Sequence, residues 1–142
     1  MAVKIASAMG ADVTVFSHSK KKEEDSKRLG AAHFLLESQK PVPKLGGGSA
    51  AFDLLLNTAP VEIDWERYLN LLDHDGAMVM LGVPDAIPKA QPFTLIGRRR
   101  SLTGSLIGGI PETQEMLDFC AKHGIVSDIE LIPTQKINEA YE

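Results

Sequence analysis

Two short apolar segments flanking one amphipathic helix limit the fold of this 142-residue chain more than any other feature. Residues 52–56 (FDLLL) and 77–81 (AMVML) are nearly continuous apolar runs, typical of strands that are covered on both faces. Between them, apolar residues recur at helical spacing from Trp65 to Leu72, and Asp64 stands at the N-cap position. The segment therefore predicts a βαβ unit with both strands central in a parallel sheet.

The rest of the chain continues this alternation of helices and strands. We expect helices at residues 2–9, 20–29, 64–72 and 111–123, and further strands at residues 12–17, 33–36, 101–107 and 128–132. Gly10, Gly30 and Gly124 stand where three of the helices should end. Short connections between alternating elements predict an α/β fold with a doubly wound parallel sheet of the Rossmann type.

Local sequence adds detail to four segments. Asp75 and Gly76 are expected to turn the chain into the strand that follows, and residues 41–49 (PVPKLGGGS) to form a loop. Met116, Leu117 and Cys120 should face inward from the helix that Pro111 begins. The last residues, KINEAYE, are expected to start another helix.

Composition narrows the functional class. The net charge of −4 argues against nucleic-acid binding through a broad basic face. No stretch approaches the roughly 20 apolar residues of a membrane span. The N-terminus lacks the basic region, apolar run and cleavage site that make up a signal peptide. We expect a cytoplasmic protein without nucleic-acid or membrane partners.

The sequence contains no recognisable set of metal ligands. Its single cysteine, Cys120, has no second cysteine or nearby histidine at a zinc-ligand spacing, and should act as a small buried hydrophobe. His33, His74 and His123 lie in unrelated contexts, where a lone histidine is usually not a ligand. We assign no metal ligand and no catalytic residue.

The end of the strand at residues 12–17 carries the strongest functional signal. Ser17, His18 and Ser19 lead into three lysines at the start of a helix, where the helix dipole disfavours cations. A phosphate held by the hydroxyls, the first-turn N–H groups and the ammonium groups would resolve this conflict. Alternatively, the lysines are a solvated helix end and Ser19 is only an N-cap.

Position favours the phosphate interpretation, because ligands of doubly wound sheets bind at the carboxyl ends of the strands. Dinucleotide-binding domains that use NAD carry an acid here to bind the ribose 2′-hydroxyl, and that acid would repel the extra phosphate of NADP. Phe16, Ser17 and His18 stand there instead. The residues therefore favour NADP.

The turns after the two central strands are further candidates. Residues 57–60 (NTAP) and 82–84 (GVP) would line the crevice of a doubly wound sheet, or they are ordinary turns. Residues 98–100, three arginines before the strand at 101–107, are more typical of a solvated edge than of a binding site.

Taken together, these segments resemble the cofactor domain of cinnamyl-alcohol-dehydrogenase-like enzymes, which are zinc-dependent members of the medium-chain dehydrogenase superfamily. The blocks that carry the resemblance are MAVKIASAMGADVTVFS, KKKEEDSKRLGA, FDLLLNTAP, GAMVMLGVP, RRRSLTGSLIGG and PETQEMLDFCAKHGI. The resemblance implies hydride transfer between NADPH and an aldehyde or alcohol, with zinc in the full-length enzyme.

The resemblance also implies a role for particular residues. The 2′-phosphate would be held by Ser17, His18, Ser19, Lys21 and Lys22, with His18 in place of a more usual hydroxyl residue. The nicotinamide side would be contacted by Thr58, Ala59, Gly82, Val83, Ser105, Leu106 and Ile107. The strand at 101–107 would pair across a homodimer.

Two parts of such an enzyme are not found in the sequence. We expect the first strand and its Gly-rich turn just before Met1, and the zinc-binding catalytic domain outside the chain. Residues 1–142 would then be a partial dinucleotide-binding domain, inactive alone. The alternative is a freestanding, non-catalytic module that binds a nucleotide or a protein.

Overall fold

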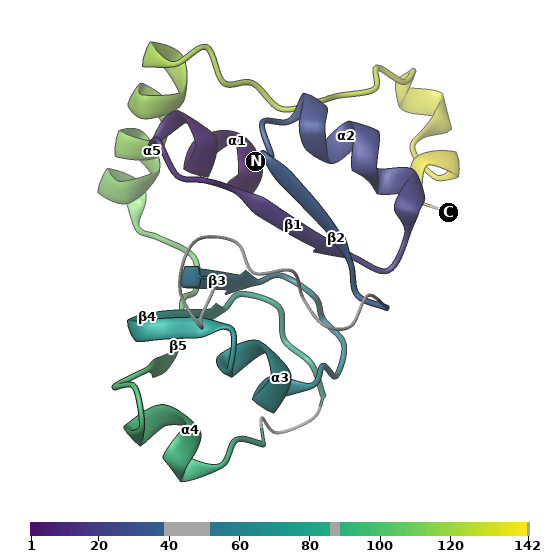
Figure 1. Cartoon of the computed structure of the whole chain (residues 1–142). Coiled ribbons are helices and arrows are strands. Elements are labelled where there is room, and N and C mark those ends of the chain that lie inside the picture. Colours follow the sequence, from purple (N-terminus) through teal and green to yellow (C-terminus); the bar gives the residue numbers. More distant parts are fainter. Residues whose placement is uncertain (39–51, 86–88, 142) are drawn as a thin grey trace. The chain divides into compact units, whose positions relative to one another are not determined.

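The computed structural model describes residues 1–38, 52–85 and 89–141, and within each of its two sheets the paired strands are parallel (Figure 1). The chain divides into two compact units, Met1–Lys40 with Gly109–Glu142, and Pro41–Gly108. The loop expected at residues 41–49 lies outside the described residues. Parallel strands alternating with helices confirm the expected α/β, Rossmann-type fold.

The first unit contains a two-stranded sheet with two helices before and between its strands. Its elements are α1 (Ala2–Ala8), β1 (Thr14–Ser17), the 3-10 turn η1 (Lys20–Lys22), α2 (Glu23–Arg28) and β2 (His33–Leu36). The register of the sheet runs from Thr14 beside His33 to Ser17 beside Leu36. Gly10 and Gly30 follow the two helices with φ of +87° and +107°, as expected of helix-ending glycines.

The C-terminal part of the first unit is less regular than the sequence predicted. Helix α5 (Ile110–Lys122) buries Cys120, but Met116 and Leu117 are exposed, so their expected inward packing is wrong. Residues 128–132 form no strand, because no described strand pairs with them. Two 3-10 turns, η2 (Thr134–Lys136) and η3 (Glu139–Tyr141), replace the expected last helix.

Charge contacts hold this irregular segment. Asp128 forms ion pairs with Lys4 of α1 and Arg28 of α2, both at 3.2 Å. Hydrogen bonds from Lys4 and Arg28 lower the pKa of the Asp128 carboxyl. The Lys4 ammonium also donates to the Val126 carbonyl at 2.7 Å. Side-chain contacts here replace the ladder of a strand.

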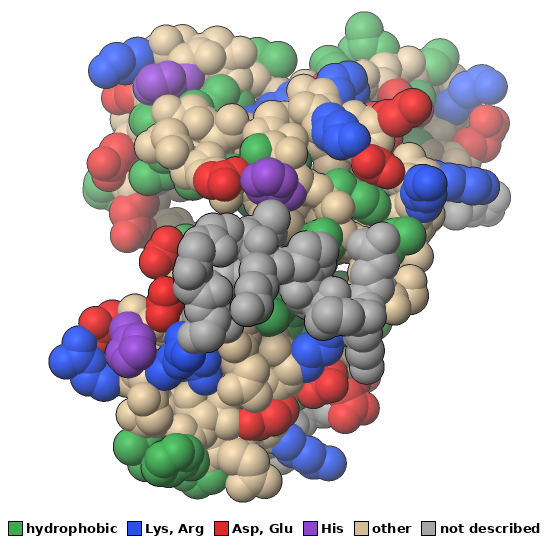
Figure 2. Space-filling model, in the orientation of Figure 1, with side chains coloured by type: hydrophobic (Ala, Val, Ile, Leu, Met, Phe, Trp, Pro, Cys, Tyr) green, Lys and Arg blue, Asp and Glu red, His purple; other side chains and the backbone are tan. Residues whose placement is uncertain are grey.

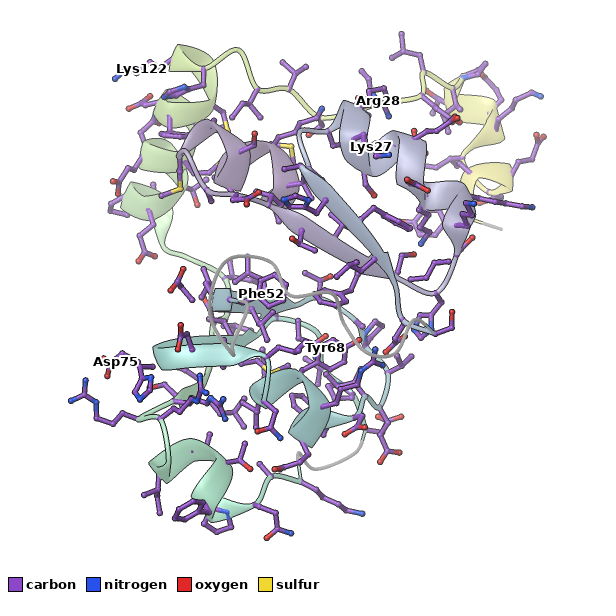
Figure 3. The ribbon with its side chains drawn as sticks, viewed as in Figure 1. Lys27, Arg28, Phe52, Tyr68, Asp75 and Lys122 are labelled. Atoms are coloured by element: carbon purple, nitrogen blue, oxygen red, sulfur yellow. The ribbon has the colours of Figure 1, made fainter. Side chains whose placement is uncertain are left out.

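The second unit contains a three-stranded sheet in the order β3-β4-β5. Its elements are β3 (Phe52–Asn57), α3 (Trp65–Leu69), β4 (Leu72–Met80), α4 (Pro92–Ile96) and β5 (Ser101–Gly104). The buried side chains of the unit include those from Trp65 to Leu72 that the helical spacing selected, with Tyr68 on α3 labelled in Figure 3. Asp64 caps α3 as expected, accepting a hydrogen bond from the Arg67 N–H at 3.1 Å.

Two details of this sheet correct the sequence interpretation. β4 is central, but β3 pairs with β4 alone among the described strands, and its Leu54 and Leu56 are 54% and 44% exposed. In the Rossmann fold the strands of the sheet lie in the order 3-2-1-4-5-6, and β3 corresponds to the fourth of them. Its other neighbour in that order is the first strand of the fold, which is not among the described strands. Asp75 and Gly76 lie inside β4, where its register with β3 shifts, rather than in a turn before it, and Asp75 has a φ of +60°.

β5 is shorter than the expected strand at residues 101–107. Its pairing with β4 ends where Met80 lies beside Gly104, because β4 itself ends at Met80. Leu106 and Ile107 lie beyond the strand and are 88% and 92% exposed. The strand predicted for residues 105–107 is therefore wrong within this chain.

The arginine run is a structural tether that the sequence did not reveal. Arg100, half-buried, donates to the Leu72 carbonyl at 2.9 Å and to the Thr94 carbonyl at 3.0 Å. Arg98 and Arg99 pair with Asp73 and Asp75 at 3.1 and 2.6 Å. Burial lowers the pKa of Arg100, and the carbonyl acceptors offset the cost of that burial. The run joins α4 and the start of β5 to β4.

This tether yields the first prediction. Arg100→Met should lower the free energy of unfolding by about 1 to 3 kcal/mol, because two backbone carbonyls lose a charged donor. Arg99→Met is the matched control and should cost less, since its ion pair with Asp75 is exposed. Urea denaturation measures both variants, and equal losses would contradict the tether.

Candidate functional site

The chain turns sharply at the carboxyl end of β1. The Ser19 N–H donates to the Ser17 hydroxyl oxygen at 3.2 Å, and the Ser17 hydroxyl lies 3.4 Å from the Ser19 carbonyl. Ser19 occupies the N-cap position of η1, but its side chain makes no capping hydrogen bond. The Ser19 hydroxyl therefore does not cap η1, although Ser19 holds the N-cap position. Both hydroxyls lie at the strand end, half-buried.

Three exposed lysines follow at once, in η1. Among the described residues, none of their ammonium groups takes part in the ion pairs of the first unit. Glu23 directly follows the three lysines. A hydrogen bond from Lys27 lowers the pKa of its carboxyl, and the charge of Lys20 lowers that pKa further. The strand end thus presents positive charge directly beside two hydroxyl groups. Lys and Arg side chains elsewhere are interspersed with acidic ones over the face shown in Figure 2.

The neighbouring strand contributes a residue that the sequence analysis missed. Glu37 follows β2, and its N–H donates to the Ser17 carbonyl at 3.0 Å. Its carboxylate lies 2.6 Å from Nδ1 of His18. The side chain of His18 is 78% exposed and that of Glu37 19%. Only the pairing of β1 with β2 brings these residues together, so sequence distance hid the contact.

The other predicted residues belong to the second unit, where Asn57 joins two turns. The Asn57 carbonyl, at the end of β3, accepts from the Leu81 and Gly82 N–H groups at 2.9 Å. Its side-chain oxygen accepts from the Ala59 N–H at 3.1 Å. Asn57 is buried, and its Nδ2 has no hydrogen-bond partner in the described part of the chain. The residue fixes the turn after β3 against the turn after β4.

Gly82 makes this contact possible. A Cβ at position 82 would lie 2.4 Å from the Ala59 carbonyl oxygen and 2.9 Å from the Thr58 carbonyl carbon. Only glycine allows so close an approach of two backbones. The structure therefore brings the Thr58–Ala59 backbone against Gly82, so the turns after β3 and β4 lie side by side.

A hollow of about 400 Å³ lies beside these turns, lined by residues 80–84 and 104–106, mostly apolar. Ser105 and Leu106 line it, although they lie beyond β5. Ile107 does not line it, nor do Thr58 and Ala59. Two of the three predicted nicotinamide-side segments thus line the hollow, and the third, Thr58–Ala59, lies against Gly82, whereas residues 17–22 belong to the other compact unit.

The described residues hold no group of three or more His, Cys, Asp and Glu side chains that could bind a metal ion. Over the same residues, none of the helices has the length and apolar character needed to cross a bilayer.

The family model described as zinc-binding dehydrogenase matches residues 1–122. A match over this much of the chain shows that the protein belongs to the zinc-binding dehydrogenase family. The resemblance that the sequence blocks indicated is confirmed.

Named relatives agree with this assignment. The chain is 54% identical over 143 residues to "NADP-dependent alcohol dehydrogenase C 1" of Mycolicibacterium smegmatis, and 46% identical over 144 residues to "Aldehyde reductase YahK" of Escherichia coli. Each comparison covers all of this chain and 40% of the relative. The chain thus spans about two fifths of the length of the relatives it matches.

Solved structures of relatives share the fold. A cinnamyl alcohol dehydrogenase of Sorghum bicolor matches 99% of the chain with a TM-score of 0.86 and 33% identity, over 39% of its own chain. The protein named "CAD" of Helicobacter pylori, in complex with NADP(H), matches 99% of the chain with a TM-score of 0.81 and 39% identity, over 40% of its own chain.

The close approach at Gly82 yields the second prediction. Gly82→Ala should lower the melting temperature, because the new methyl group would displace the Thr58–Ala59 backbone. Gly104→Ala is the matched control, since a Cβ there meets nothing nearer than the Met80 carbonyl at 3.8 Å. Thermal denaturation should separate the two variants; the account of a close backbone approach at Gly82 fails if both melt alike.

Proposed function

We propose that this chain is the NADP(H)-binding part of an alcohol dehydrogenase or aldehyde reductase, which transfers a hydride between NADPH and an aldehyde. The observation that carries the proposal is the carboxyl end of β1, where hydroxyls and exposed lysines stand in place of an acid. The names of the relatives support the choice of cofactor and of reaction.

The 2′-phosphate of the cofactor would bind at this strand end. The Ser17 and Ser19 hydroxyls would donate to its oxygens, and Lys21 and Lys22 would balance its charge. His18 would lie at the same site through its position between the two serines. An adenosine ribose without the phosphate would find no acid on β1 to accept its hydroxyl hydrogens.

The nicotinamide half would bind in the second unit. The Thr58–Ala59 and Gly82–Val83 turns would contact its ribose, and Ser105, Leu106 and Ile107 would lie beside the ring. The apolar walls of the hollow would exclude water from one face of the ring, which protects the transferred hydride. These residues bind and orient the cofactor, and none acts as an acid or a base.

The described residues do not fit a zinc site, because they contain no suitable group of ligands. We place the catalytic zinc and most of the substrate pocket of the proposed enzyme outside these residues, and assign residues 1–142 to the dinucleotide-binding domain. The contribution of this chain to the reaction is thus to bind and orient the cofactor.

The third prediction tests the cofactor. In the full-length enzyme, the triple variant S17D, K21A and K22A should lower kcat/KM for NADPH by about two orders of magnitude, because the phosphate loses two charged partners and meets a carboxylate. NADH use should stay similar or improve, since the introduced carboxylate offers an acceptor to the ribose hydroxyl. Steady-state kinetics with both cofactors on one aldehyde would measure this.

Removal of two other exposed lysines, Lys122 and Lys136, is the control for the loss of two positive charges, and should leave kcat/KM for both cofactors unchanged. The phosphate assignment of residues 17–22 is wrong if the wild-type enzyme prefers NADH, or if kcat/KM falls equally for both cofactors in the triple variant.

The fourth prediction concerns assembly. We propose that two copies pair through the region of β5, where Leu106 and Ile107 are exposed beyond the end of the strand. Leu106→Pro should yield monomers, because proline removes a backbone donor that an intermolecular strand would need. Leu106→Ala keeps the donor and serves as the control. An unchanged dimer of the proline variant in sedimentation would count against this interface.

A further inference from the structure

The strand end that lacks an acid of its own receives one from its neighbour. Ser17 lies beside Leu36 in the parallel register, so the residue after Leu36 is carried to the same edge of the sheet. That residue is Glu37, whose N–H donates to the Ser17 carbonyl at 3.0 Å. A carboxylate is therefore anchored beside the proposed phosphate site, although β1 contains none.

A carboxylate at this place has two consequences for cofactor choice. It would repel the 2′-phosphate of NADPH, and it could accept a hydrogen bond from the ribose 2′-hydroxyl of NADH. Both effects favour NADH. The proposed preference for NADPH therefore requires that the charge of Glu37 be balanced or turned away from the ligand.

His18 is placed to do this. Its Nδ1 lies 2.6 Å from the Glu37 carboxylate, whereas most of the imidazole is exposed at the strand end. The contact occupies an oxygen of the carboxylate and, when the imidazole is protonated, cancels its charge. The exposed imidazole thus lies against a carboxylate whose own side chain is largely buried.

We propose that His18 masks Glu37, and that this pair is a specificity determinant for NADPH over NADH. The inference rests on the proposed function. His18 acts through Glu37 and is a positioning residue, and it need not contact the phosphate. The pair gives an exposed histidine between two serines a role in cofactor choice that its position in the sequence alone does not indicate.

A double-mutant cycle in the full-length enzyme tests the proposal. His18→Ala should lower kcat/KM for NADPH about five- to tenfold, because the unmasked carboxylate repels the phosphate. The same variant should leave kcat/KM for NADH unchanged or raise it. Adding Glu37→Gln to His18→Ala should restore NADPH use to within about twofold of the wild type, since the neutral amide cannot repel.

Salt and a matched control separate this effect from a loss of structure. The loss of kcat/KM for NADPH in His18→Ala should become smaller as the salt concentration rises from about 0.05 to about 0.5 M, because salt screens the interaction between exposed charges. His33 and Asp12 form a similar pair at 3.2 Å, but His33 begins β2 and so lies at the opposite edge of the sheet. His33→Ala should change neither cofactor preference nor its salt dependence.

The possible outcomes are distinct. If the wild-type enzyme prefers NADPH but Glu37→Gln fails to rescue His18→Ala, the masking is refuted and the proposed function stands. An equal fall of kcat/KM for NADPH and NADH in His18→Ala also refutes masking. A wild-type enzyme that does not prefer NADPH overturns the proposed function and this inference together.

Discussion

The parallel pairing of neighbouring strands is the constraint on which the candidate site depends. Parallel strands place their carboxyl ends at one edge, so residues far apart in sequence meet there. Ser17 and Glu37 meet through the β1–β2 ladder, and the turns after β3 and β4 meet through Asn57 and Gly82. The ladders that stabilise the two sheets therefore also assemble the surfaces that we propose bind the cofactor.

Each proposed binding surface combines this geometry with a different kind of chemistry. The end of β1 presents charge and hydroxyl groups to solvent, which suits a phosphate. The turns of the second unit present backbone and an apolar hollow, which suit an uncharged ring. A dinucleotide with an extra phosphate contains both a charged phosphate and an uncharged ring. Membership of the zinc-binding dehydrogenase family agrees with such a ligand.

Sequence predicted well those features that local chemistry decides. β2 has the predicted bounds, Asp64 caps α3, and glycines with positive φ follow α1 and α2. Features that depend on a distant partner were missed. Residues 105–107 and 128–132 have strand-like composition but no neighbour to pair with among the described strands, and Arg100 became a tether only because β4 lies beside it. Glu37 entered the candidate site for the same reason, since no local pattern connects it with Ser17.

The central claim is that the carboxyl end of β1 binds the 2′-phosphate. Titration of the full-length protein with adenosine 2′,5′-bisphosphate and with AMP tests this claim without catalysis, zinc or substrate. We predict that the bisphosphate binds at least about tenfold more tightly than AMP, and that the difference falls as salt increases. Equal dissociation constants for the two nucleotides would contradict the account.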